Sequence, residues 1–391
     1  MKLKKIITFL IMCTFIFNFS IVYATENIND EQIEEPAEEE GMKIYSEAAI
    51  LIEKKTGKIL YEKNIHDRKY PASTTKILTA ILAIENCDLN ETAMASQSAI
   101  DSLEDGYTKA DIQVGEEFTI DQLISVMMIQ SANEAATIIA EHISGSTEEF
   151  SKLMNKKAKE IGCLDSNFVN PNGMHNENHY STAYDLAMIA RYCMNNEKFR
   201  EYCILKEASL PWTDYWQAEQ VQEHGERIFH NTNNMMQKDN KFYYPTCIGI
   251  KAGFTTPAKN CLVSASNKDG FEVISVILHA ETTEDGVSAR YIDTINLFNY
   301  GYENYKLSEI LEEYDMLYDT QESVVGKISD QFQGTSSFFG EQLNSKDTSE
   351  ININVIKILI GIICVVIGII IFWRGKRGKR EATNKMYKFN L

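Results

Sequence analysis

The sequence predicts an α+β domain in which strands at both ends enclose a long helical middle. Two short apolar runs lie within residues 48–61, a mostly helical pattern covers 71–202, and three further apolar runs follow residue 244. Strands and helices that are grouped in this way, and do not alternate, are typical of α+β folds. The ordered part covers roughly 260 residues, which is within the range of one domain.

Composition agrees with a folded protein and argues against several functions. Of the 391 residues, 44% are hydrophobic and 24% are charged, as in ordinary globular proteins. The formal net charge of −18 argues against a nucleic-acid-binding surface, because phosphates would be repelled. The eight cysteines include no Cys-x-x-Cys pair, and the seven histidines show no metal-ligand spacing. No cofactor or metal is expected.

Both termini have the features of membrane-targeting segments. Three lysines precede an apolar run that ends near Ala24, which predicts a secretory signal peptide over residues 1–24, with an uncleaved anchor as the alternative. Residues 355–373 are apolar except for one lysine and would span roughly 28 Å as a transmembrane helix. The basic segment 374–391 predicts a cytoplasmic C-terminus, which leaves residues 25–354 on the extracytoplasmic side of the membrane.

The N-terminal elements follow an acidic spacer. Residues 25–42 carry eight acidic residues and no basic one, which predicts a disordered segment. The apolar runs 48–52 and 59–61 flank Lys55-Thr56-Gly57, and a turn between two such runs predicts a hairpin.

Helical spacing then dominates, for example over 123–128. Asn170-Pro171-Asn172-Gly173 predicts a turn, and Thr182 followed by Asp185 resembles a helix N-terminal capping box.

Strands return in the last part of the domain. The runs 247–254, 261–265 and 273–278 predict an antiparallel meander, and 288–305 predicts a helix. Residues 306–354 are polar with little core-forming pattern, so a stalk is expected there.

The segment Ser73-Thr74-Thr75-Lys76 pairs a nucleophile with a base. On a helix that begins near Ser73, residues three apart share a face, so Lys76 would lie against the Ser73 hydroxyl. A neutral lysine can accept the serine proton when burial or nearby cations lower its pKa. The motif alone is weak, because a helix start followed by a solvated lysine has the same spacing.

Two further motifs follow in the order that penicillin-interacting serine enzymes require. Ser131-Ala132-Asn133 offers a hydroxyl that can relay a proton and an amide that can hold a substrate backbone. Lys251-Ala252-Gly253 falls in a predicted strand, where lysine supplies a cation and glycine permits close backbone approach.

With these motifs, the sequence resembles the serine-type D-alanyl-D-alanine carboxypeptidases, the low-molecular-mass penicillin-binding proteins of bacteria. The resemblance covers residues 43–305. Four stretches carry it: Tyr70-Pro71-Ala72-Ser73-Thr74-Thr75-Lys76, Ser131-Ala132-Asn133, His179-Tyr180-Ser181-Thr182-Ala183-Tyr184-Asp185 and Gly249-Ile250-Lys251-Ala252-Gly253-Phe254. It implies a β-lactamase-like fold, with a five-stranded antiparallel sheet flanked by helices and a helical subdomain.

The resemblance also implies the reaction and its catalytic residues. The enzyme would remove the terminal D-alanine from peptidoglycan stem peptides during cell-wall maturation. Ser73 would be the acylated nucleophile, Lys76 its general base, and Ser131 would pass a proton toward the leaving D-alanine. β-Lactams would be covalent inhibitors.

Substrate binding is implied for residues of the second and third motifs. Asn133 would bind the stem peptide, and Lys251 would attract its terminal carboxylate. Gly253 allows the strand to approach, and the backbone N–H groups of Ser73 and Phe254 would form an oxyanion hole.

Three departures from the family pattern matter. Ala252 stands where the family has threonine, so a hydroxyl that would bind the substrate carboxylate is missing. Pro257-Ala258-Lys259-Asn260 replaces a stretch that usually holds Ala-Gly and an aromatic residue. Residues 306–354 are too few for the further β-rich domain of many relatives. A literal Lys55-Thr56-Gly57 precedes Ser73 and is interpreted as a hairpin turn only.

Alternative functions remain open at this point. A membrane-tethered peptidoglycan-binding protein with impaired catalysis is the main one, because of Ala252. A β-lactamase is disfavoured, since no Glu-x-x-Leu-Asn segment is present to position a deacylating water. Trp212 and Trp216 are interpreted as loop-packing residues, with a sugar-binding groove as the alternative.

Overall fold

A computed structural model describes residues 42–103, 106–216, 226–283 and 286–316. The chain divides into two compact units, Met1–Leu311 and Glu312–Leu391, and all elements named below belong to the first. The predicted signal peptide, transmembrane segment and basic tail lie outside the described residues, as do nearly all of the spacer and most of the stalk.

Within those described ranges, no helix combines the length and the apolar character needed to cross a membrane.

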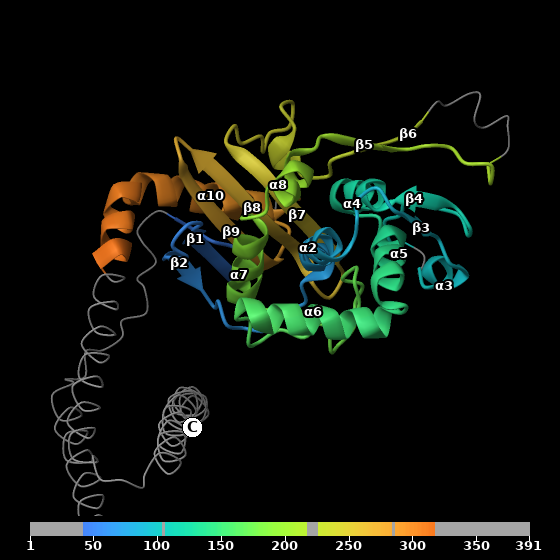
Figure 1. Ribbon diagram of the computed structural model, residues 1–391. Coiled ribbons are helices and arrows are strands. Elements are labelled where there is room, and N and C mark those ends of the chain that lie inside the picture. The colour runs from blue at the N-terminus through green and yellow to red at the C-terminus, as the bar shows by residue number, and fades with distance from the viewer. Residues whose placement is uncertain (1–41, 104–105, 217–225, 284–285, 317–391) are drawn as a thin grey trace, which may run out of the picture. The chain divides into compact units, whose positions relative to one another are not determined.

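A five-stranded antiparallel sheet forms the centre of the fold, as predicted. Its strand order is β2-β1-β9-β8-β7. The strands are β1 (Ala48–Glu53), β2 (Ile59–Lys63), β7 (Cys247–Thr255), β8 (Lys259–Lys268) and β9 (Phe271–Ala280). The N-terminal hairpin joins the C-terminal meander because β1 pairs with β9, with Ile50 opposite Val276. This order leaves β7 at one edge of the sheet (Figure 1).

The turn between β1 and β2 is built by one carboxylate. Glu53 accepts hydrogen bonds from the backbone N–H groups of Lys55 and Thr56, at 2.7 and 2.6 Å. Gly57 has a φ of +78°, which glycine adopts without strain. Lys55-Thr56-Gly57 is therefore a hairpin turn, as the sequence predicted.

The chain between the hairpin and the meander carries most of the helices among the described residues. It contains η1 (Ala72–Thr75), α2 (Lys76–Asn86), α3 (Gln97–Asp101), α4 (Ile120–Ile129), α5 (Asn133–Ser144), α6 (Thr147–Ile161), α7 (Ala183–Cys193) and α8 (Glu197–Ile204). Two short strands, β3 (Thr92–Met94) and β4 (Glu117–Thr119), pair with each other. After the meander, α10 (Ala289–Asn304) confirms the predicted last helix.

The predicted cap of α7 is half right. The Thr182 hydroxyl accepts the Asp185 N–H at 3.0 Å, as expected of an N-cap. The Asp185 carboxylate instead accepts hydrogen bonds from the Asp165 N–H and the Ser166 hydroxyl. It thereby holds the loop after α6 and does not return to the cap.

Apolar side chains pack on both faces of the sheet. Alternate residues of β1 separate between two clusters: Ala48, Ile50 and Ile52 face the helical side, and Ala49 and Leu51 face α10. This is the period-two pattern of a strand that is buried on both faces. In Figure 1, α2 and α7 lie on one face of the sheet and α10 on the other.

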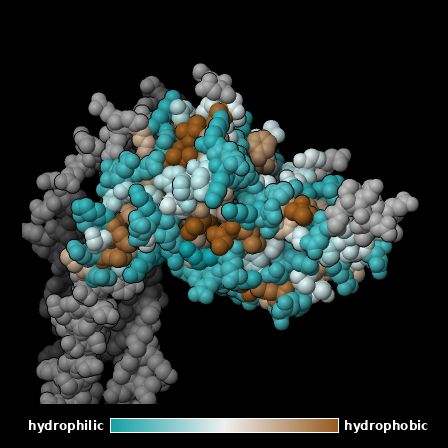
Figure 2. Space-filling model, turned by 90° about the horizontal axis from the view of Figure 1, so that it is seen from above, coloured by the Kyte–Doolittle hydropathy of each residue, from teal (hydrophilic) through white to brown (hydrophobic). Residues whose placement is uncertain are grey.

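An arm formed by β5 (Glu207–Leu210) and β6 (Arg227–His230) extends from the helical side (Figure 1). The end of this hairpin where Leu210 pairs with Arg227 is held by an ion pair between buried Arg227 and Glu116, at 3.0 Å. The ring centroids of Trp212 and Trp216 lie 5.3 and 5.4 Å from Cζ of the same guanidinium. This contact gives both tryptophans the expected packing role. The face shown in Figure 2 is mainly hydrophilic, and its hydrophobic patches are separate from one another.

Candidate active site

Ser73 lies in a short 3-10 turn that leads directly into α2. The N–H and the hydroxyl of Thr74 both donate to the Pro71 carbonyl, at 3.3 and 2.7 Å. Because η1 and α2 are continuous, Lys76 follows Ser73 by one turn, and its side chain returns toward the serine. Ser73 is partly exposed, so a substrate can reach its hydroxyl.

Lys76 is completely buried and makes three polar contacts. Its Nζ lies 3.0 Å from Ser73 Oγ, 2.8 Å from Asn133 Oδ1 and 2.5 Å from the Asn172 carbonyl oxygen. Burial and the charge of Lys251 hold the Lys76 pKa well below its usual range, against a smaller opposing effect of Glu134. The neutral amine that a general base requires is therefore favoured.

The turn between α4 and α5 carries the second motif. Ser131 has a φ of +69° and is largely buried, and Asn133 is the first residue of α5. The Asn133 Nδ2 donates to the Thr108 carbonyl at 2.7 Å, which directs its Oδ1 toward Lys76. Within the described part of the chain, no hydrogen bond joins the Ser131 hydroxyl to Ser73 or Lys76.

The third motif lies on β7, which packs against η1. A Cβ atom added to Gly253 would lie 2.8 Å from the Ser73 nitrogen and 3.1 Å from Ala72 Cβ, so the strand edge leaves room for glycine alone. The next side chain, Phe254, is 59% exposed. The edge of the sheet therefore borders the serine directly.

Lys251 is a buried cation near this edge. Its Nζ donates to the Ala252 carbonyl at 3.1 Å. Burial and the nearby Arg290 guanidinium lower the Lys251 pKa to about 7. Because the Lys251 charge also lowers the Lys76 pKa, the two amines belong to one electrostatic site.

Three residues at the site were not anticipated from the sequence. The Asn172 carbonyl holds Lys76, whereas its segment was predicted only as a turn. Glu134 is buried next to Asn133, and burial raises its pKa. Arg290, at the start of α10, donates to the Gly253 carbonyl at 3.1 Å. Glu134 adjoins a motif and could have been suspected, but the other two positions carry no local signal.

His179, from the stretch 179–185 of the resemblance, supports the site without facing it. Its Nδ1 accepts the Val169 N–H at 3.1 Å, so its Nε2 donates to the Thr75 hydroxyl at 2.8 Å. Burial and the charges of Lys76 and His175 lower its pKa to about 3. His179 is therefore neutral, and its two hydrogen bonds connect the 169–179 segment to η1.

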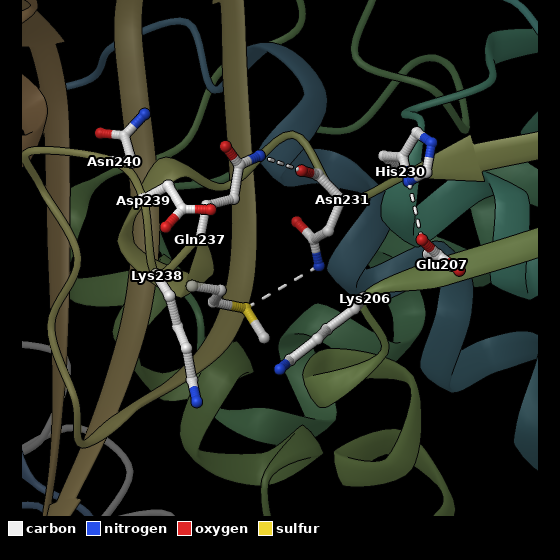
Figure 3. Close-up of a pocket in the computed structure, with 9 residues that line it drawn as sticks. Lys206, Glu207, His230, Asn231, Gln237, Lys238, Asp239 and Asn240 are labelled. Atoms are coloured by element: carbon white, nitrogen blue, oxygen red, sulfur yellow. Dashed lines mark hydrogen bonds and ion pairs between the residues drawn. The ribbon is translucent and has the colours of Figure 1, made fainter.

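A separate cavity of about 560 Å³ lies at the base of the arm. Figure 3 shows its polar lining, in which Glu207 pairs with His230. The lining residues are Lys206, Glu207, His230, Asn231, Met236, Gln237, Lys238, Asp239 and Asn240. None of them is a predicted site residue. We place the candidate chemistry at Ser73 and not in this cavity, because the predicted nucleophile and its predicted base are in contact there.

A comparison with family sequence models places the chain among known proteins. The sequence model of the D-alanyl-D-alanine carboxypeptidase family matches residues 32–282. The chain belongs to this family. The match confirms the resemblance that the four sequence stretches predicted.

Two curated family members illustrate the similarity. The chain is 35% identical over 244 residues to DacF of Bacillus subtilis (strain 168), covering 61% of this chain and 59% of DacF. It is 26% identical over 275 residues to DacA of Haemophilus influenzae, covering 69% of this chain and 65% of that protein. The chain thus spans less than two thirds of the length of these two relatives.

Solved structures share the fold. The crystal structure of the Streptomyces K15 DD-transpeptidase matches with a TM-score of 0.59 and 28% identity, covering 67% of this chain and 98% of that one. The D-alanyl-D-alanine carboxypeptidase from Mycobacterium tuberculosis H37Rv matches with a TM-score of 0.60 at 24% identity, covering 68% and 94%. Both bear out the predicted fold class.

Proposed function

We propose that this protein is a serine D-alanyl-D-alanine carboxypeptidase that removes the terminal D-alanine from peptidoglycan stem peptides. The observation that carries the proposal is the 3.0 Å contact between Lys76 Nζ and Ser73 Oγ in a buried site. Membership of the family supports the same reaction.

Lys76 is oriented to accept the serine proton. Asn133 Oδ1 and the Asn172 carbonyl can only accept hydrogen bonds, and a neutral amine has two N–H groups to donate. Both N–H groups of neutral Lys76 are therefore engaged, and its lone pair is left for the Ser73 hydroxyl. As Ser73 Oγ attacks the carbonyl of the penultimate D-alanine, its proton moves to Lys76 Nζ.

The substrate would bind along the β7 edge. Lys251, with Arg290 beside it, supplies positive charge for the terminal carboxylate. The backbone N–H groups of Ser73 and Phe254 would stabilise the oxyanion, an effect for which loss of one donor costs about 3–4 kcal/mol in other enzymes. Asn133 would hold the peptide backbone of the stem.

The remaining steps return the site to its starting state. Ser131 passes the proton from Lys76 to the nitrogen of the leaving D-alanine, and the C–N bond breaks to give a Ser73 ester. Water then attacks this ester and gives a proton to Lys76 Nζ. Lys76 passes that proton to Ser73 Oγ as the ester C–O bond breaks, which frees the stem carboxylate and restores the Ser73 hydroxyl and the neutral amine. A β-lactam would form the same ester by opening its ring, but its leaving group stays attached, which makes it a covalent inhibitor.

The test uses the full-length chain purified in detergent. Incubation with a stem pentapeptide that ends in D-Ala-D-Ala should release D-alanine. Ser73→Ala should abolish both this release and labelling by fluorescent penicillin. Ser102→Ala, on an exposed turn away from the site, is the matched control and should retain both. Absence of D-alanine release by the wild-type chain would count decisively against the activity.

Impaired catalysis is the second candidate, because Ala252 lacks the family's hydroxyl. In that case the protein would bind peptidoglycan and would not label with penicillin, or would label without turnover of the pentapeptide. A sacculus-binding assay beside the two measurements above separates these outcomes.

We also propose that the domain lies outside the bacterial cell membrane, anchored by residues 355–373 with a cytoplasmic tail. The support is the apolar length of that segment and the basic residues that follow it. In whole cells, added protease should remove an epitope placed at residue 306 and should spare one placed after residue 391. Release of the chain by alkaline carbonate would contradict the anchor.

A further inference from the structure

The two helices that begin at the candidate active site end beside a cluster of three potential metal ligands. Helix α2 begins with Lys76 and is followed by Cys87, while α5 begins with Asn133 and carries His142 in its last turn. Glu91 lies in the loop that follows Cys87. At 1.5 Å per residue, this cluster lies roughly 14–17 Å along the helices from Lys76 and Asn133.

The three side chains converge although the sequence separates them. One ligand atom from each of Cys87, Glu91 and His142 lies within 4.8 Å of the other two. His142 Nε2 is 3.3 Å from Glu91 Oε1. All three side chains are at least partly accessible, so an ion can enter from solvent.

Backbone hydrogen bonds position the loop that carries Glu91. The Glu91 N–H donates to the Asp88 carbonyl at 3.1 Å, and the Glu91 carbonyl accepts the Ile120 N–H at 3.0 Å. The Leu89 carbonyl accepts the next N–H, that of Asp121, at 3.0 Å. The loop is therefore attached to the start of α4, and Glu91 is held in place opposite His142.

The local electrostatics favour a cation. The C-terminal end of a helix carries partial negative charge, and the ends of α2 and α5 both approach this cluster. Glu91 adds a carboxylate.

We propose that Cys87, Glu91 and His142 bind one zinc ion, with water as the fourth ligand. A thiolate, an imidazole and a carboxylate together suit zinc, whereas calcium and magnesium prefer oxygen ligands alone. Tetrahedral zinc needs ligand atoms about 3.3–3.7 Å apart, given bond lengths of about 2.0–2.3 Å. Small rotations of three partly exposed side chains reach that spacing from the observed one. As the Cys87 sulfur bonds the metal, its thiol proton passes to solvent.

The ion would have a structural role that does not depend on the proposed reaction. It would join the far ends of α2 and α5, whose near ends are already joined by the hydrogen bond between Lys76 and Asn133. The sequence pattern could not reveal this site, because Cys87 and Glu91 lie in a loop and His142 comes from a different helix.

The test titrates the full-length, metal-free chain with cobalt(II), a spectroscopic substitute for zinc. One equivalent should produce the charge-transfer absorption of a cobalt–thiolate bond, and zinc should remove it by displacement. Cys87→Ser should lose this band. Loss of a residue that only supports a metal ligand typically weakens metal binding by roughly 10- to 100-fold. Glu91→Gln and His142→Gln each remove a ligand itself and should weaken cobalt binding by more than this.

His230→Gln is the matched control. His230 pairs with Glu207 at 3.2 Å, as His142 pairs with Glu91, and it should leave cobalt binding unchanged. Zinc should also raise the melting temperature of the wild type and of this control, with no shift for Cys87→Ser.

Two results would overturn the proposal: no thiolate band in the wild type, or the same band in Cys87→Ser. Penicillin labelling of each variant reports whether Ser73 is still correctly placed. If Cys87→Ser fails to fold, the Glu91 and His142 variants decide the question by their cobalt affinities.

Discussion

Lys76 Nζ donates to Asn133 Oδ1 at 2.8 Å, and each of these two residues is the first of its helix. The contact joins the starts of α2 and α5 inside the protein, where the Lys76 amine has no access to water. Because Asn133 is uncharged, it orients the amine and stabilises its charged form less than a carboxylate would. This relationship makes the protonation of Lys76 sensitive to single substitutions around it.

Asn133→Asp should move the acid limb of the pH–rate profile, measured for acylation of Ser73 by penicillin, to higher pH. A carboxylate at this distance favours the ammonium form and typically raises a partner's pKa by about 1–3 units. Acylation at neutral pH should fall and recover as the pH rises. The check is the rate of Ser73 labelling across pH; loss of activity that no pH restores would show that Asn133 acts only in substrate binding.

Glu134→Gln should shift the same limb in the opposite direction. The Glu134 charge raises the Lys76 pKa, so its removal makes the neutral amine available at lower pH. The same labelling assay measures the shift. An unmoved limb would mean that Glu134 is already neutral in the folded protein.

Ala252→Thr should accelerate acylation of Ser73. A hydroxyl that binds the substrate carboxylate contributes about 1.5–3 kcal/mol, or about 10- to 150-fold in rate. Ala252→Val has the same shape without the hydroxyl and should not accelerate it. An unchanged rate for threonine would show that another group already binds the carboxylate.

Arg290→Gln should extend acylation to higher pH. Lys251 attracts the carboxylate only when protonated, and its pKa of about 7 predicts that acylation efficiency falls as pH rises above 7. Removing the guanidinium raises this pKa, so the fall should occur at higher pH. Arg191→Gln, whose side chain binds the β1–β2 turn, should leave the basic limb where it is.

His179 should destabilise the fold in mild acid. Its pKa is about 3 when folded, against a reference value of 6.5, so below pH 6.5 the unfolded chain binds a proton that the folded protein refuses. The free energy of unfolding should fall by about 1.4 kcal/mol per pH unit from this group as the pH drops from 6.5 toward 3.

Urea unfolding at pH 7 and pH 5 measures this effect. His179→Gln should be less stable at pH 7, because its hydrogen bonds are disturbed. Its free energy of unfolding should, however, fall by about 2 kcal/mol less than that of the wild type between pH 7 and pH 5. His66→Gln, at an exposed position, should keep the wild-type pH dependence.

The sequence predicted the features that depend on residues close together in the chain. The β1–β2 hairpin, the meander β7–β9 and α10 follow from runs of apolar side chains, and their predictions are confirmed. The arm of β5 and β6 was missed, because its strands have only four residues each and Arg227 occupies the buried position that an apolar side chain would mark.

By itself, then, the sequence determined the fold class and the order of the three motifs, and it predicted Ser73 as the nucleophile and Lys76 as its base, because one helical turn connects these two residues. Tertiary structure alone decided that the Asn172 carbonyl binds that base, that Arg290 lies beside Lys251, and that Cys87 meets His142. These contacts, and the pKa values that depend on them, follow from burial and from the distances between remote segments. Both are properties of the folded chain only.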